Sequence, residues 1–189
     1  PEHAEPARFL PHVQGLRAIA VLSVVLYHFW PGRFPGGYIG VDIFFVISGF
    51  LITSHLMREL TATGTVRLGQ FWARRARRLL PASLLVLLFC ALVAMTPYLT
   101  PTSALPNEVR EILASTFYVE NWYLAITSAD YLNNGGDPTT VQHYWSLSLE
   151  EQFYVIWPLL MLLAAWAAVK WAQGAVRRSV IALLAVVSA

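Results

Sequence analysis

Arg17 and His28 bring a permanent cation and a titratable imidazole into one apolar run, Val13 to Trp30. They are eleven positions apart, so in a helix they return to within about 20° of the same face, about 16 Å apart along it. Ionisable side chains inside a membrane-length apolar run predict a functional polar path. The bland alternative is that Arg17 extends to the lipid headgroups while His28 caps the outer end of the helix.

Asp42 is the second candidate, in a glycine-rich block that runs from 36 to 52. It is expected near the outer end of its helix, at the depth of His28. Within hydrogen-bond reach, its carboxylate would fix the imidazole tautomer and raise its basicity. The alternative is a cap at an interfacial helix end.

Arginines form the third candidate site, in the segment Phe71 to Pro81. Arg74, Arg75, Arg77 and Arg78 fall within five residues, and the spacing of Arg75 and Arg78 places both on one helix face. Such a pair suits a fork for phosphate oxygens. Composition alone favours the alternative, an anchor to anionic lipid on the cytoplasmic side.

Adjacent carboxylates mark the fourth block, His143 to Pro158. Glu150 and Glu151 enter an apolar helix about 100° apart, so one is expected to face the bundle and the other its surface. Ser146 and Ser148 precede them as supporting residues, and the spacing of Ser146 and Glu150 resembles a capped helix start.

Composition places these candidates in a membrane. The chain of 189 residues is 57% hydrophobic and 13% charged, too little charge for a soluble surface, and its apolar blocks are long enough to span a bilayer. The net charge of +2 gives no reason to expect a nucleic-acid partner. Cys90 is the single cysteine, so neither a disulfide nor a metal cluster is predicted, and its expected role is packing.

The elements that must position these residues are membrane helices, and the predicted fold is an all-α polytopic transmembrane bundle. Residues 127–142 are expected to be a polar loop because Asn-Asn-Gly-Gly-Asp-Pro is a turn signal. The expected helices are Pro11–Trp30, Tyr38–Leu60, Leu79–Met95 with Pro81 in its first turn, an interfacial helix Asn107–Ile126, His143–Trp171, and a last one after Arg178.

The basic residues between the second and third spans predict that this loop is cytoplasmic. Residues 1–10 would then be a cytoplasmic tail on a multi-pass protein of the cell membrane. If residues 107–126 do not cross, Lys170, Arg177 and Arg178 also lie inside, as the rule prefers. The chain starts with Pro1 and ends in an apolar segment too short to span, so we expect residues 11–189 to be the front part of a larger membrane domain.

Together the four blocks resemble the membrane acyltransferase-3 family, which O-acylates cell-surface polysaccharides, peptidoglycan and macrolides. The resemblance covers about residues 9 to 160, with Asn121-Trp122-Tyr123 between the third and fourth blocks. Four blocks in the family order are specific where each alone is not. The matching positions are Arg17 and His28; Gly37 to Ile52; Phe71, Arg74, Arg75, Arg78 and Pro81; and Trp145 to Tyr154.

The resemblance implies transfer of an acyl group, most simply acetyl, from cytoplasmic acyl-CoA to a hydroxyl of an extracytoplasmic glycan or related acceptor. Arg17 and the arginines Arg74, Arg75 and Arg78 would hold the CoA phosphates. His28 would be the general base, oriented by Glu150 with Glu151 as second candidate. Acetyl-CoA would be a substrate, with no tightly bound cofactor and no metal. Family domains have about ten membrane helices, and some members carry an extracytoplasmic transferase domain.

Two rival functions remain open at this point. A transporter or anion pathway would use Arg17 as a counter-ion and His28 as a proton relay, and would move its substrate without covalent change. A non-catalytic scaffold would keep these residues only for packing, and would retain function without His28.

Overall fold

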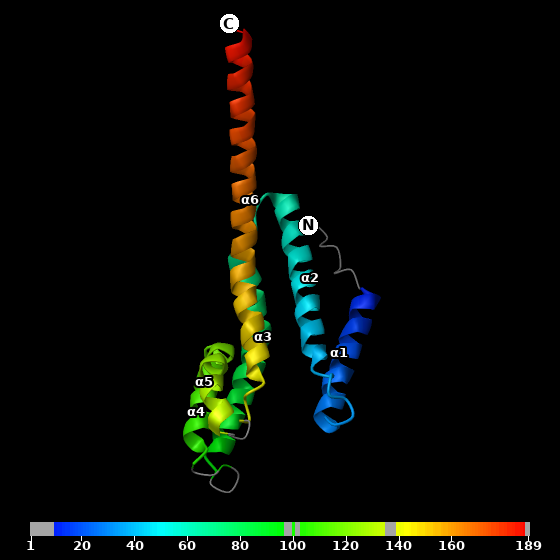
Figure 1. Cartoon of the computed structure of the whole chain (residues 1–189), viewed down its shortest axis with the longest axis vertical. Coiled ribbons are helices and arrows are strands. Elements are labelled where there is room, and N and C mark those ends of the chain that lie inside the picture. Colours follow the sequence, from blue (N-terminus) through cyan, green and yellow to red (C-terminus); the bar gives the residue numbers. More distant parts are fainter. Residues whose placement is uncertain (1–9, 97–99, 101–102, 135–138, 188–189) are drawn as a thin grey trace. The chain divides into compact units, whose positions relative to one another are not determined.

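The computed structural model describes residues 10–96, 100, 103–134 and 139–187, and within them every regular element is an α-helix. The helices are α1 (Pro11–Phe29), α2 (Ile39–Thr63), α3 (Leu68–Ala94), α4 (Leu105–Thr116), α5 (Glu120–Asn134) and α6 (Tyr144–Val187) (Figure 1). They divide into two compact units, Pro1–Arg58 and Glu59–Ala189. The predicted all-α class is confirmed.

Four of the described helices are long and apolar enough to cross a membrane: α1, α2, α3 and the part of α6 from Tyr144 to Gln173. Helices α4 and α5 do not qualify. The chain is therefore a multi-pass membrane protein, as the apolar blocks predict.

Glycines bring α1 and α2 into close contact in the first unit. An added Cβ at Gly37 would lie 2.3 Å from the Ser23 carbonyl oxygen, and one at Gly40 would lie 2.4 Å from the Ala20 carbonyl oxygen. Only a residue without a side chain fits such an approach of two backbones. The predicted ends of both helices are confirmed within a few residues, and Gly64 (φ +73°) ends α2 in the left-handed conformation.

Helix α3 begins at Leu68, eleven residues before its predicted start at Leu79. The prediction placed the helix start where the apolar run starts, but hydropathy marks a membrane boundary and not a helix end. Alanine, arginine and leucine are strong helix formers, so the arginine segment is helical too. Pro81 consequently lies inside the helix and not in its first turn.

The predicted single helix over residues 107–126 is wrong, because the chain turns between α4 and α5. Tyr118 adopts φ +55°, and the Val119 amide donates to the Ala114 carbonyl at 2.9 Å, closing the end of α4. Glycine usually occupies such a position, which is why no turn was expected at a tyrosine. Helix α5 then continues to Asn134, so the predicted loop over residues 127–142 is wrong in its first half.

Helices α4 and α5 form a helical hairpin that packs against α3 and α6. The core of the contact is Leu87, Val141 and Tyr144, with Cys90, Ile112 and Leu147 packed around it. Cys90 therefore has the packing role expected of it. Two hydrogen bonds, Trp72 to Tyr154 and Tyr144 to Ser83, show that α3 and α6 are antiparallel because the residue numbers run in opposite directions.

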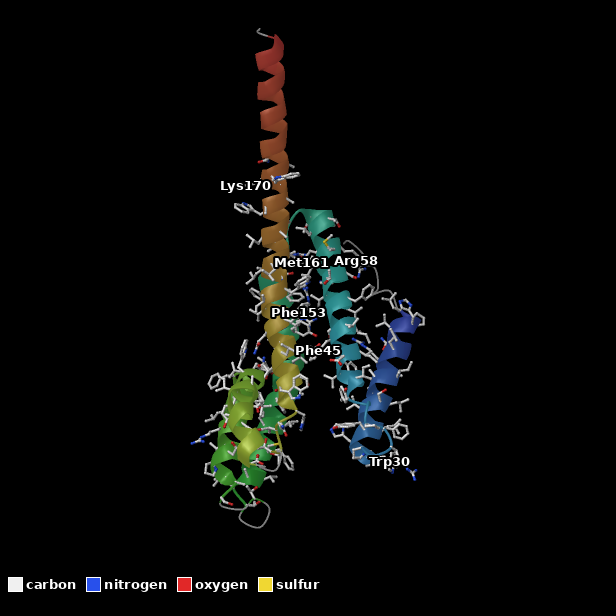
Figure 2. The ribbon with its side chains drawn as sticks, viewed as in Figure 1. Trp30, Phe45, Arg58, Phe153, Met161 and Lys170 are labelled. Atoms are coloured by element: carbon white, nitrogen blue, oxygen red, sulfur yellow. The ribbon has the colours of Figure 1, made fainter. Side chains whose placement is uncertain are left out.

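Helix α6 is one continuous helix from Tyr144 to Val187, so the predicted break before a last helix after Arg178 is wrong. Lysine, arginine, alanine and glutamine continue a helix outside the membrane as well as inside it. Figure 2 shows Phe153, Met161 and Lys170 along this helix, and Lys170 Nζ lies 4.4 Å from the ring centroid of Trp166.

Pro158 interrupts the backbone hydrogen bonding of α6. Proline has no N–H, so the Tyr154 carbonyl four residues earlier loses its helical donor. The Trp72 indole of α3 supplies one instead, with Nε1 3.1 Å from the Tyr154 oxygen. Since an unpaired carbonyl is costly in a membrane, this bond fixes the register of α3 against α6.

Buried glutamates tie the hairpin to the start of α6. Glu108 accepts from the backbone N–H of Thr140 at 3.2 Å and from its hydroxyl at 2.8 Å. Glu111 accepts from Asn107 at 3.1 Å and from the hydroxyl of Thr139. Glu120 is fully buried beside Glu111, and burial first, then the Glu111 charge, raises its pKa from 4.5 to about 8.

We expect the stability of the protein to fall as pH rises from about 5 to about 8. Glu120 binds its proton more tightly in the folded state, so its favourable contribution is complete below pH 4.5 and is lost as pH rises through about 8. Glu120→Gln mimics the protonated group and should flatten this dependence. Thermal unfolding in detergent between pH 5 and 9 checks it, with Glu59→Gln as a control that keeps the slope. A flat wild-type profile would contradict the prediction.

Candidate functional site

His28 lies in the last turn of α1, where its Nδ1 is 2.8 Å from the Val24 carbonyl oxygen. A carbonyl only accepts, so Nδ1 carries the proton and donates it to this bond. The neutral ring then keeps a lone pair on Nε2. The side chain is exposed. In this tautomer Nε2 is the ring nitrogen that is able to accept a proton.

The hydrogen bond expected between Asp42 and His28 is not formed. Asp42 is exposed in the first turn of α2, and the Val24 carbonyl takes the place at His28 Nδ1 that the sequence analysis gave to this carboxylate. A backbone carbonyl one helical turn away reaches the ring without any tertiary contact, so no partner on α2 is needed to fix the tautomer.

Arg17 and His28 both lie on one side of the face of α1 that packs on α2. Ala20 is fully buried in that face, and at about 100° per residue Arg17 lies about 60° and His28 about 80° from it, on the same side. Arg17 is half-buried. The continuous helix therefore presents the cation and the imidazole along one edge of the α1–α2 contact, as their spacing predicts.

Of the arginines in the third block, Arg75 is the one that lines a cavity. Its guanidinium carbon lies 3.4 Å from the ring centroid of Tyr154 and 5.2 Å from that of Phe71, so two aromatic faces hold it by cation–π contact. It lines a cavity of about 170 Å³ between α3, α6 and the turn of the hairpin. Arg74 and Arg78 are exposed, so the predicted fork places one arginine inside and one outside.

The adjacent carboxylates separate as their helical spacing predicts. Glu151 lines the cavity with Arg75, while Glu150 accepts a hydrogen bond from the Tyr154 hydroxyl one turn later. Glu151 is thus the carboxylate that shares the cavity with Arg75 in the second unit, whereas the sequence analysis named it only as the second candidate to orient His28. His28 belongs to the other unit, and the expected pairing of His28 with Glu150 stays a prediction.

The two serines of the fourth block have different surroundings. Ser146 donates to the His143 carbonyl at 3.1 Å inside a helix that already begins at Tyr144, so it is not the expected cap. Ser148 is fully buried, and its hydroxyl has no hydrogen-bond partner among the described residues. Both remain supporting candidates only.

Sequence reasoning missed three residues that shape the cavity. Tyr118 lines it from the turn of the hairpin, Trp72 from α3, and Gln152 fastens the hairpin to α6 from the next position after Glu151. The Gln152 amide donates to the Tyr118 carbonyl and to Asn121, both at 2.8 Å. The available signal was the glutamine inside an apolar helix, which needs polar partners when it is buried.

Metal chemistry finds no support in the described part of the chain, where no group of three or more His, Cys, Asp or Glu side chains is placed to hold an ion. The arrangement instead offers an imidazole base in one unit and an aromatic-bound cation with a carboxylate in the other.

Known proteins have sequences similar to this chain. A family model described as an acyltransferase domain matches residues 11–189. The peptidoglycan O-acetyltransferase OatA of Listeria monocytogenes is 39% identical over 167 residues, 88% of this chain and 26% of its own length. The O-acetyltransferase OatA of Staphylococcus aureus strain NCTC 8325 is 42% identical over 155 residues, 82% of this chain and 25% of its own.

The chain thus spans about a quarter of the length of the curated relatives it matches. No solved structure matches it. The family match covers all six helices, including both candidate regions, the α1 edge with His28 and the cavity with Arg75. By this match and by the identity of its relatives, the chain belongs to the acyltransferase-domain family.

Proposed function

We propose that the protein is a membrane O-acetyltransferase that moves an acetyl group from cytoplasmic acetyl-CoA to a hydroxyl of an extracytoplasmic glycan. The hydrogen bond of His28 Nδ1 to the Val24 carbonyl carries the proposal, because it leaves Nε2 as a base in a chain whose relatives are named O-acetyltransferases. The acceptor class is taken from the Listeria relative, which is named for peptidoglycan.

The reaction needs one proton acceptor and one stabilised donor. His28 Nε2 takes the proton of the acceptor hydroxyl as its oxygen attacks the thioester carbonyl, the C–O bond forms, and the C–S bond breaks. The imidazolium then returns the proton to the departing CoA sulfur. Arg17 stands on the same edge of α1, about 16 Å from His28, so in this proposal it holds a CoA phosphate while the thioester lies at His28.

Arginines supply the donor site in this proposal. Arg74 and Arg78, exposed on α3, reach the CoA phosphates, while Arg75 directs the donor into the cavity. Glu150 is proposed to balance the charge of His28 once the imidazole has taken up the proton, and Asp42, Ser146 and Ser148 support the site. The lipid bilayer is the solvent of these helices, and an additional extracytoplasmic transferase domain or partner is part of the proposal.

The test uses inverted membrane vesicles that contain the full-length protein, supplied with acetyl-CoA labelled in the acetyl group. Base-labile label on glycan inside the vesicles, absent without the protein, is the expected result. Labelled CoA that crosses unchanged would instead show a transporter. Label that stays on CoA outside would show that the donor or its side is wrong.

Arg75→Lys is expected to weaken donor use about tenfold or more. Lysine keeps the charge but loses the planar group that stacks between Phe71 and Tyr154. The KM for acetyl-CoA in the vesicle assay should therefore rise. Arg77→Lys is the matched control, because Arg77 is exposed and, among the residues that the structure describes, donates only to the Ala73 carbonyl of its own helix. Equal KM values for both variants would remove Arg75 from the donor site.

A further inference from the structure

The cavity between α3 and α6 contains polar groups whose hydrogen bonds are not made. The Tyr118 hydroxyl and Glu151 Oε1 are both buried and have no hydrogen-bond partner among the described residues. Both residues line the cavity together with Arg75, Trp72, Leu79 and Tyr154. Buried polar groups normally find partners, so two orphans around one cavity point to a ligand that supplies them.

Arg75 adds a third group of this kind. Its guanidinium stacks on two rings, but no hydrogen bond from its five N–H groups is formed within the described part of the chain. Glu151 attracts it electrostatically, yet no ion pair within 4.0 Å joins the two. The cation and the carboxyl group therefore face the same space without closing on one another.

The backbone of Tyr118 shows that this side chain is retained at a cost. It occupies the left-handed conformation, φ +55°, at a helix end where glycine fits without strain. Gln152 holds the turn in place through the Tyr118 carbonyl at 2.8 Å. The turn thus places a tyrosine in the lining of the cavity, with its hydroxyl buried beside it, where a glycine would have sufficed for the fold.

The three groups together select the chemistry of the ligand. Arg75 donates only, Tyr118 can donate, and Glu151 Oε1 accepts. A phosphate offers acceptors only and would leave Glu151 without a donor, while an ammonium group would leave Arg75 without an acceptor. A secondary amide offers a carbonyl oxygen on one edge and an N–H on the other. The apolar walls, which include Leu79, Leu80 and Val155, suit the methylene groups beside it.

We propose that this cavity binds a secondary amide of the pantetheine arm of the acyl donor. The amide carbonyl accepts from Arg75 and the Tyr118 hydroxyl, and the amide N–H donates to Glu151 Oε1. This inference rests on the proposed use of acetyl-CoA and adds Tyr118 and Glu151 as residues that hold the arm. No bond is made or broken in this step.

The test measures binding of acetyl-CoA, and of two analogues, to the purified full-length protein. Each analogue has one of the two amides of the arm replaced by an ester, which keeps the carbonyl and removes the N–H. One analogue is expected to bind the wild type about tenfold to a hundredfold more weakly. The Glu151→Ala variant should bind acetyl-CoA more weakly than the wild type by a similar factor. It should bind the weaker analogue with the same affinity as acetyl-CoA, because the N–H that the analogue lacks no longer has an acceptor.

The Tyr118→Phe variant gives a second measurement. It remains informative even if the Glu151→Ala variant does not fold. It removes only an unpartnered hydroxyl, so the ligand-free protein should unfold at a higher temperature while its Kd for acetyl-CoA rises about tenfold. Tyr123→Phe is the matched control: the Tyr123 hydroxyl donates to Asn107 at 3.2 Å outside the cavity, so its loss should lower the Tm and leave the Kd unchanged.

Equal binding of both analogues to the wild type, or wild-type affinity in both cavity variants, would overturn the inference. Glycan acetylation in the vesicle assay would then still stand, so the proposed function would survive alone. A wild type that does not bind acetyl-CoA at all would overturn the inference together with the proposed donor.

Discussion

His28→Ala is expected to abolish glycan acetylation, with a loss of about a hundredfold to ten-thousandfold in rate. The physical reason is the bond from Nδ1 to the Val24 carbonyl, which reserves Nε2 as the proton acceptor. Alanine removes that acceptor but leaves α1 intact, because alanine favours helix and the side chain is exposed. Base-labile acetate on the cell-surface glycan, at matched membrane levels of full-length protein, measures the effect.

His12→Ala is the control for this experiment. His12 lies on the same helix, is exposed like His28, and stands near the opposite end of α1. Its loss should leave acetylation unchanged. Equal acetate from wild type and the His28 variant would exclude this imidazole from the chemistry and would leave the scaffold interpretation.

Gly40→Ala is expected to separate α1 from α2 and to remove activity through structure, not chemistry. The new methyl group would lie 2.4 Å from the Ala20 carbonyl oxygen and 2.7 Å from Val24 Cγ2, so the two backbones must move apart. Overpacking of this kind costs about 1–3 kcal/mol. We expect a lower Tm in detergent and a loss of glycan acetylation in the same variant.

Gly15→Ala provides the comparison, since an added Cβ there meets nothing within 4 Å and the residue also lies inside α1. It should leave the Tm unchanged or raise it. A Gly40→Ala protein as stable as Gly15→Ala would show that the close contact is dispensable.

The sequence predicted best where local chemistry decides. Proline and glycine mark the ends of α1 and α2, and the long apolar blocks mark the spans. It failed at Leu68, where a helix begins before its apolar part, and at Tyr118, where a tyrosine takes a turn position typical of glycine. At Leu68 the prediction relied on hydropathy where helix propensity decides, and at Tyr118 the turn is held by Gln152, a contact that no short window contains.

The sequence likewise predicts some residues of the candidate site and not others. Residue types alone identified Arg75 and Glu151 as unusual in an apolar setting. The residue types do not predict which side chains surround them. Trp72 and Tyr154, for example, are 82 residues apart and meet only because of the register of α3 on α6. Tyr118 could be assigned to the cavity only from the structure, in which the turn between α4 and α5 lies beside α3 and α6.

Pro158 gives α6 a pivot. At that turn one rung of the helical ladder is missing, and the Trp72 indole replaces it from another helix. Bending stiffness is lowest at such a point. Beyond it the helix continues for 29 residues to Val187, an arm of about 44 Å, so a tilt of about 10° at the pivot would swing its tip by about 8 Å. The indole that replaces the missing rung also lines the cavity, so the cavity adjoins the point at which α6 bends most easily.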